Sequence, residues 1–152
     1  MVFPSVARMH TTCTFLPADF APTDWAPDVT TALPTGHAHM TKTFQGGLEG
    51  RSVTQFTHAF DLQTGIGTYV AMESVEGVLD GRAGSFNLVH SATTDGVSPE
   101  RLHEFLLIVP GSATEELTGL TGTGTMRVTD DGTHHLDLDY DLDYDLGTGA
   151  GG

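Results

Sequence analysis

Short runs of alternating apolar and polar residues follow one another along most of the chain, with glycine-rich turns between them. In the clearest run, Leu136, Leu138 and Tyr140 alternate with aspartates. A period of two is typical of half-buried β-strands, which place the aspartates in water and the apolar partners inside. No window keeps the i, i+3, i+4, i+7 spacing of an amphipathic helix over three turns. The pattern predicts strands over 9–16, 36–45, 51–61, 67–79, 82–94, 102–109, 122–129 and 133–142.

Eight strands at short spacing favour one all-β domain, either a closed antiparallel barrel or a sandwich. The proline-rich segment 17–34 is predicted to be a long connection that Trp25 holds to the core. Segment 110–120 is the one predicted helical turn, capped by Ser112 or Thr114. The domain organisation expected is a flexible leader over 1–8, the barrel over 9–145 and a disordered Gly-rich tail over 146–152.

An internal repeat predicts which strand faces point inward. Residues 44–51 and 75–82 share the pattern apolar-x-Gly-x-Leu-acid-Gly-Arg, which predicts two-residue hairpin turns at Glu49-Gly50 and Asp80-Gly81. The second turn places Ala71 opposite His90, and the first places Phe44 opposite Gln55 and Lys42 opposite Thr57. The residues then expected on the inner face are Lys42, Tyr69, Ala71, Glu73, Val75, Phe86, Leu88 and His90.

Composition excludes several classes of binding partner and site. The chain has 152 residues and a formal net charge of −14, which excludes the clustered cations that nucleic acid or an anionic membrane requires. That length suits one domain with a real core. Cys13 is the only cysteine, so an internal disulfide and a Cys-rich zinc site are excluded. The sequence shows no spanning helix and no secretory signal, so we expect a cytoplasmic protein without a membrane partner.

Four segments together carry a family resemblance. KTFQGGLEG (42–50), YVAMESVEGVLDGRAGSFNLVH (69–90), VPGSATEELTGLTGTG (109–124) and LDY (138–140) resemble the uncharacterised domain-of-unknown-function 3224 family, over about residues 10–142. That family is similar, more distantly, to the allene oxide cyclase barrel and to spirotetronate cyclases. The resemblance implies an eight-stranded antiparallel barrel, oligomeric, with an internal ligand cavity and no established reaction. Segments 95–102 and 17–34 depart from the family pattern and are expected to shape the barrel mouth.

Three ionisable residues, Lys42, Glu73 and His90, are predicted to share the lumen. One interpretation is a proton-transfer site in which Glu73 is the base and His90 or Lys42 the donor. The other is a structural network, because buried charges must be paired. The eight histidines include His37 and His39 on one face, but the sequence has no convergent metal-ligand pattern, and no metal or cofactor is expected. Cys13 is expected to be a buried small hydrophobe.

Three functions fit these observations. The first is a barrel that binds an apolar, partly oxygenated small molecule and acts as a cofactor-free isomerase or cyclase of a biosynthetic pathway, confining its substrate in a reactive shape. The second is a lipocalin-like carrier, and the third a scaffold with a filled core. The substrate-binding residues expected are Tyr69, Phe86, Leu88, Gln55, Leu136, Tyr140 and Trp25, with Glu73, His90 and Lys42 as the catalytic ones.

Overall fold

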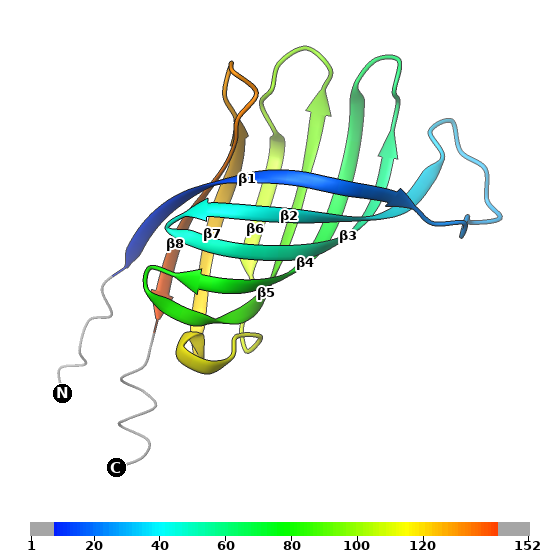
Figure 1. The fold of residues 1–152 in the computed structure, drawn as a ribbon. Helices are drawn as coiled ribbons and strands as arrows, with labels where there is room; N and C mark the ends of the chain where they lie inside the picture. Colours follow the sequence, from blue (N-terminus) through cyan, green and yellow to red (C-terminus); the bar gives the residue numbers. More distant parts are fainter. Residues whose placement is uncertain (1–7, 143–152) are drawn as a thin grey trace, which may run out of the picture.

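A computed structural model describes residues 8–142 as eight antiparallel strands closed into a barrel (Figure 1). The strands are β1 (Met9–Pro22), β2 (Thr35–Gly46), β3 (Leu48–Phe60), β4 (Ile66–Leu79), β5 (Arg82–Asp95), β6 (Leu102–Ile108), β7 (Leu120–Val128) and β8 (His134–Leu142). Neighbours in the chain are neighbours in the sheet, and β1 pairs with β8 to close the ring. The all-β prediction is confirmed. Of the two architectures that the strand pattern favoured, the structure forms the barrel and not the sandwich. The predicted tail and most of the predicted leader lie outside the described residues.

The β4–β5 hairpin has the predicted register. Val75 lies opposite Phe86, and Ala71 lies opposite His90. Asp80 and Gly81 both have positive φ, 48° and 89°, as a two-residue turn of this hand requires. The local sequence therefore determines which face of this hairpin points inward.

The predicted β2–β3 hairpin is wrong. The strands turn at Gly47, so Lys42 lies opposite Ser52 and not opposite Thr57. Gly50 instead lies within β3, where a Cβ atom would be only 2.1 Å from the carbonyl oxygen of Glu76 on β4. Its glycine thus permits a close approach of two strands rather than a turn. Lys42 still faces inward, because alternation along β2 does not depend on the partner strand.

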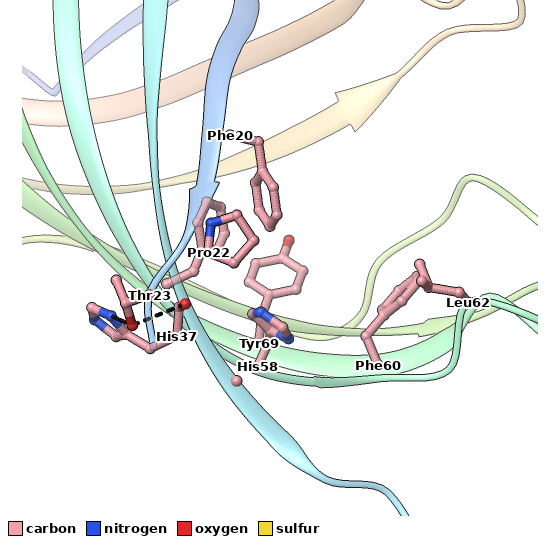
Figure 2. Close-up of a pocket in the computed structure, with 10 residues that line it drawn as sticks. Phe20, Pro22, Thr23, His37, His58, Phe60, Leu62 and Tyr69 are labelled. Carbon is pink, nitrogen blue, oxygen red and sulfur yellow. Dashed lines mark hydrogen bonds between the residues drawn. The ribbon is translucent and has the colours of Figure 1, made fainter. Parts of the chain in front are cut away.

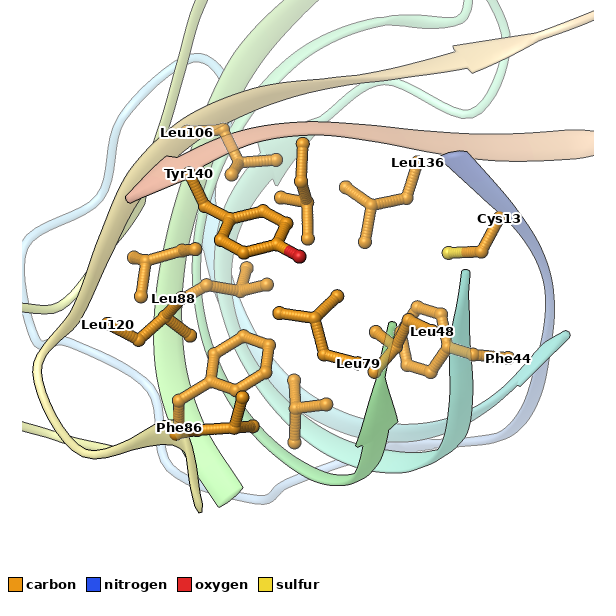
Figure 3. Packing of buried hydrophobic residues seen from close by; sticks show 14 of the residues in the cluster. Cys13, Phe44, Leu48, Leu79, Phe86, Leu88, Leu106, Leu120, Leu136 and Tyr140 are labelled. Atoms are coloured by element: carbon orange, nitrogen blue, oxygen red, sulfur yellow. The ribbon is translucent and has the colours of Figure 1, made fainter. Parts of the chain in front are cut away.

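One end of the barrel is filled by its hydrophobic core, and we call it the closed end (Figure 3). It carries the β2–β3 and β4–β5 turns and a single 3-10 turn, η1 (Glu115–Leu117), which confirms the predicted helical turn. Its main core residues are Phe44, Leu48, Leu79, Phe86, Leu88, Ile108, Leu117, Leu120, Leu136, Leu138 and Tyr140. The Tyr140 hydroxyl donates a hydrogen bond to Asp80 over 2.5 Å, and Thr11 donates to the same carboxylate over 2.9 Å.

The connection between β1 and β2 differs from its prediction. Strand β1 continues to Pro22, with an irregularity between Ala18 and Ala21, and the remaining loop extends away from the barrel (Figure 1). Trp25 in this loop is 72% exposed, so the prediction that it anchors the segment to the core is wrong. An extended loop at this end leaves the lumen accessible there, and we call this the open end. It also carries the β3–β4, β5–β6 and β7–β8 turns.

Candidate functional site

A buried ion pair lies against the hydrophobic core, inside the barrel. The Lys42 ammonium nitrogen is 2.8 Å from Glu73 Oε1, and the two side chains are 4% and 0% exposed. Ser52 donates a hydrogen bond to Glu73 Oε2 over 2.6 Å, so both carboxylate oxygens have partners. Lys42 also lies 4.7 Å from the centre of the Phe15 ring and 3.8 Å from the Met126 sulfur. These contacts compensate the two charges and confirm that Lys42 and Glu73 share the interior.

The buried His90 on β5 forms a second pair, with a partly buried residue that the sequence did not single out. Its Nε2 atom lies 2.7 Å from Oε2 of Glu104 on β6. Glu104 also accepts hydrogen bonds from the Met126 amide, over 3.0 Å, and from the Thr125 hydroxyl. Burial alone would raise the pKa of Glu104, but these hydrogen bonds outweigh it and lower the pKa. Burial lowers the pKa of His90, partly opposed by Glu104.

Tyr69 and Arg101 extend this network. The Tyr69 hydroxyl lies 3.5 Å from His90 Nδ1, and Arg101 Nε donates a hydrogen bond to the Tyr69 oxygen over 2.8 Å. In neutral His90, the Glu104 carboxylate favours the proton on Nε2, which leaves Nδ1 as an acceptor facing Tyr69. Burial raises the pKa of Tyr69, while the Arg101 charge opposes the rise. The order of groups is carboxylate, imidazole, phenol and guanidinium.

These groups border a cavity of about 190 Å³, which we call the inner cavity. Its wall combines donors or cations with apolar and aromatic groups, and neither Glu73 nor Glu104 lines it. The lining residues are Phe15, Pro17, Met40, Lys42, Phe56, Tyr69, Ala71, His90, Arg101, Met126 and His134. Lys42 and His90 therefore reach one cavity, as predicted, while Glu73 lies behind Lys42.

A larger apolar cavity of about 520 Å³ lies at the open end, and we call it the mouth pocket (Figure 2). Side chains from β1, β2, β3 and β4 surround it, and it shares Phe56 and Tyr69 with the inner cavity. Its other lining residues are Phe20, Pro22, Thr23, Gly36, His37, His58, Phe60 and Leu62. Pro17, Pro22 and Arg101, from the two segments expected to shape the mouth, line these cavities.

The remaining predicted substrate-binding residues lie elsewhere. Phe86, Leu88, Leu136 and Tyr140 face inward as predicted, but they belong to the core of the closed end and not to the wall of either cavity. Gln55 is exposed, so the prediction that it faces inward is wrong. The cause is the shifted β2–β3 register, which turns odd-numbered residues of β3 outward. Trp25 likewise lines neither cavity.

A sequence signal for Glu104 existed. It alternates with Leu106 and Ile108, which are 4% and 0% exposed, so all three share the inner face of β6. Ser52 carried no comparable signal, because its inward direction depends on the β3 register. Arg101 precedes its strand, where alternation predicts nothing.

The histidine and cysteine expectations have different outcomes. His37 and His39 share a face, with ring centres 5.3 Å apart. His58 on β3 lies opposite Gly36 on β2. Residues 8–142 contain no group of three His, Cys, Asp or Glu side chains placed to hold a metal ion. Cys13 is 4% exposed, which confirms a buried thiol, and burial raises its pKa to about 12.

The fold and cavities define a small closed β-barrel with an accessible polar and apolar lumen. The model for the "Protein of unknown function (DUF3224)" family matches residues 11–140. This chain belongs to that family. A crystal structure of a protein with unknown function from the same family in Shewanella oneidensis MR-1, at 1.84 Å resolution, has 32% sequence identity and a TM-score of 0.78. The match covers 90% of this chain and 98% of that one.

No curated protein matches the chain. Within residues 8–142, no helix is long and apolar enough to cross a membrane.

Proposed function

We propose that this protein binds an apolar small molecule in the open end of its barrel. The observation that carries the proposal is the pair of adjoining cavities, about 520 and 190 Å³, that share Phe56 and Tyr69. Ligand sites commonly combine a mostly apolar cavity of this size with a few polar groups. The mouth pocket supplies the apolar part, and the inner cavity supplies the polar groups.

Titration with the neutral fluorophore N-phenyl-1-naphthylamine tests this proposal. We expect saturable binding with increased emission, because the fluorophore leaves water for the mouth pocket. Phe60→Asp places a charge in that pocket and should weaken binding about tenfold or more. Val97→Asp is the matched control, since Val97 is 92% exposed and lines neither cavity. Absence of saturable binding, or equal weakening by both variants, contradicts the proposal.

A second candidate function is cofactor-free isomerisation or cyclisation, which the chain Glu104–His90–Tyr69 favours. In this scheme the Tyr69 hydroxyl gives a proton to the substrate or takes one from it. His90 Nδ1 exchanges that proton with Tyr69, and Glu104 stabilises the imidazole in the required tautomer. Arg101 stabilises negative charge on the Tyr69 oxygen. Lys42 polarises a substrate oxygen, while Glu73 serves to hold Lys42.

Hydrogen–deuterium exchange tests this chemistry without knowledge of the natural substrate. The probe is 2-decanone in D₂O, with deuterium at its α-carbons followed by mass spectrometry. An isomerase of this kind should accelerate exchange, and Tyr69→Phe should lower the protein-dependent rate about a hundredfold. Val97→Asp should leave it unchanged. Binding of the ketone without accelerated exchange contradicts the isomerase and favours the carrier.

The proposal also includes the cellular location and the oligomeric state. We propose a cytoplasmic protein that forms homo-oligomers. Apolar residues on the outer face of β3 and β4 support self-association: Val53, Val70 and Met72 are 41%, 53% and 42% exposed. Sedimentation velocity tests it, because a monomer at micromolar concentration contradicts the oligomer.

A further inference from the structure

Arg101 is the cation of the inner cavity that has no carboxylate partner. Among residues 8–142, Lys42 pairs with Glu73 and His90 contacts Glu104, whereas no ion pair involves Arg101. Its Nε atom donates to Tyr69, and no described residue accepts a hydrogen bond from its terminal amino groups. The guanidinium is half-buried in the cavity wall. A positive charge with unused donors therefore borders the inner cavity, and Arg101 also borders a neighbouring pocket that Glu100 and Glu104 line.

The other polar groups near the inner cavity also leave positive rather than negative charge on its wall. Carboxylates stand behind the wall: Glu73 is held by Lys42, and Glu104 by His90. Burial lowers the pKa of both His90 and His134, and the charges of Arg101 and Lys42 lower it further. The two imidazoles are thus kept neutral next to two permanent cations. With His90 neutral, the Glu104 charge offsets one of these cations, but both carboxylates lie behind the wall. The charged groups that line the inner cavity are Lys42 and Arg101, so an anion is favoured beside Arg101, the one without a carboxylate partner among the described residues.

The volumes of the two cavities indicate where the anionic group and the apolar body of a ligand would lie. The inner cavity, about 190 Å³, accommodates a head group and a short part of a chain. The mouth pocket, about 520 Å³, is bordered by Phe20, Phe60 and Leu62 and suits an apolar body. The cavities share Phe56 and Tyr69, so one molecule can occupy both.

We infer that the terminal amino groups of Arg101 bind the carboxylate of an amphipathic monoanion whose apolar body occupies the mouth pocket. Two parallel N–H donors match the two oxygens of a carboxylate, which a single ammonium cannot do. Tyr69, held by Arg101 Nε, orients the guanidinium toward the cavity. This inference rests on the proposed function and adds the chemical class of the ligand.

Competition with bound N-phenyl-1-naphthylamine by three probes of equal chain length tests it. Decanoate should displace the fluorophore about tenfold more effectively than decanol, and decylammonium should be weakest, because only decanoate forms charge-assisted hydrogen bonds with Arg101. If fluorophore binding is intact but decanol matches decanoate, the inference is overturned and the binding function stands. If neither the fluorophore nor any probe binds, the proposed function fails as well.

Variants locate the head group. Arg101→Gln should weaken decanoate about tenfold and leave decanol and the fluorophore unchanged. Arg51→Gln removes the same charge from the outer face, where Arg51 is paired with Glu76, and should leave all ligands unchanged. Unaltered decanoate affinity in Arg101→Gln overturns the inference.

A conservative variant covers the case in which Arg101→Gln disturbs the fold. Arg101→Lys keeps the charge but loses the paired donors. Weakened decanoate with normal fluorophore binding supports the head-group site, and equal decanoate affinity overturns it.

Discussion

The two ends of this barrel share the same strands, yet side chains fill only one of them. At the closed end, inward positions of β4 and β5 hold residues such as Val75, Phe86 and Leu88. Toward the open end, the same faces of β2, β4 and β5 hold Ala38, Ala71 and Ala92, all fully buried. An eight-stranded barrel is just wide enough for its interior to be filled by side chains or to hold a small ligand. The size of a few inward residues therefore decides between core and cavity.

The largest expected difference in stability is between two variants that each truncate a phenylalanine, one at either end of the barrel. Phe86→Ala should lower the free energy of unfolding by about 3–5 kcal/mol, because it leaves a cavity in the core. Phe60→Ala, at a residue 40% exposed at the mouth, should lower it by less than about 1 kcal/mol. Chemical denaturation measures both. Similar losses at the two ends would contradict the division into core and cavity.

The ion pair at the boundary between the ends should give the next largest effect. Glu73→Gln leaves the buried Lys42 without its counter-charge and should cost about 3 kcal/mol. The double variant Lys42→Met/Glu73→Gln removes both charges and should recover most of that loss. Glu76→Gln, in an exposed pair with Arg51, is the control and should cost less than about 1 kcal/mol. A double variant less stable than Glu73→Gln would mean that the pair itself stabilises the fold.

A smaller effect should appear as pH dependence at the open end. His90 binds a proton less readily in the folded protein than in the unfolded chain, because burial lowers its pKa below the ordinary 6.5. Its contribution to stability is complete above that pH and is lost as the pH falls toward the folded-state pKa. The slope from one such group cannot exceed about 1.4 kcal/mol per pH unit.

Urea denaturation across mildly acidic pH measures that slope. His90→Gln, which keeps an amide donor toward Glu104, should reduce it. Part of the slope should remain, since the pKa of His134 is also lowered by burial. An unchanged slope in His90→Gln would assign the pH dependence to other groups.

The smallest expected change in stability comes from filling the cavity. Ala71 lines the inner cavity, so the added side chain in Ala71→Leu has free space and should change the free energy of unfolding by less than about 1 kcal/mol. Decanoate binding should nevertheless fall, because the leucine occupies the space of the head group. Fluorophore displacement checks this, and unchanged decanoate affinity would place the head group elsewhere.

Local sequence predicted the directions of individual strands better than the contacts between strands. Alternation placed Leu136, Leu138 and Tyr140 inside, and the Asp80-Gly81 turn oriented Glu73 and His90 correctly. The β2–β3 hairpin failed because the Glu49-Gly50 pair resembles a turn, although Gly50 is needed where β3 approaches β4. No pattern within one strand reports how closely its backbone must approach a neighbour.

By itself, therefore, the sequence determined an all-β fold with Lys42, Glu73 and His90 on the inner faces of its strands, because side-chain direction follows from the period of two within each strand. Only the tertiary structure decided that Lys42 contacts Glu73 and that Glu104 supports His90. It also decided that Arg101 reaches the cavity from a connection. These contacts join side chains on different strands and loops, and their distances depend on the register and closure of the barrel, which are properties of the whole chain.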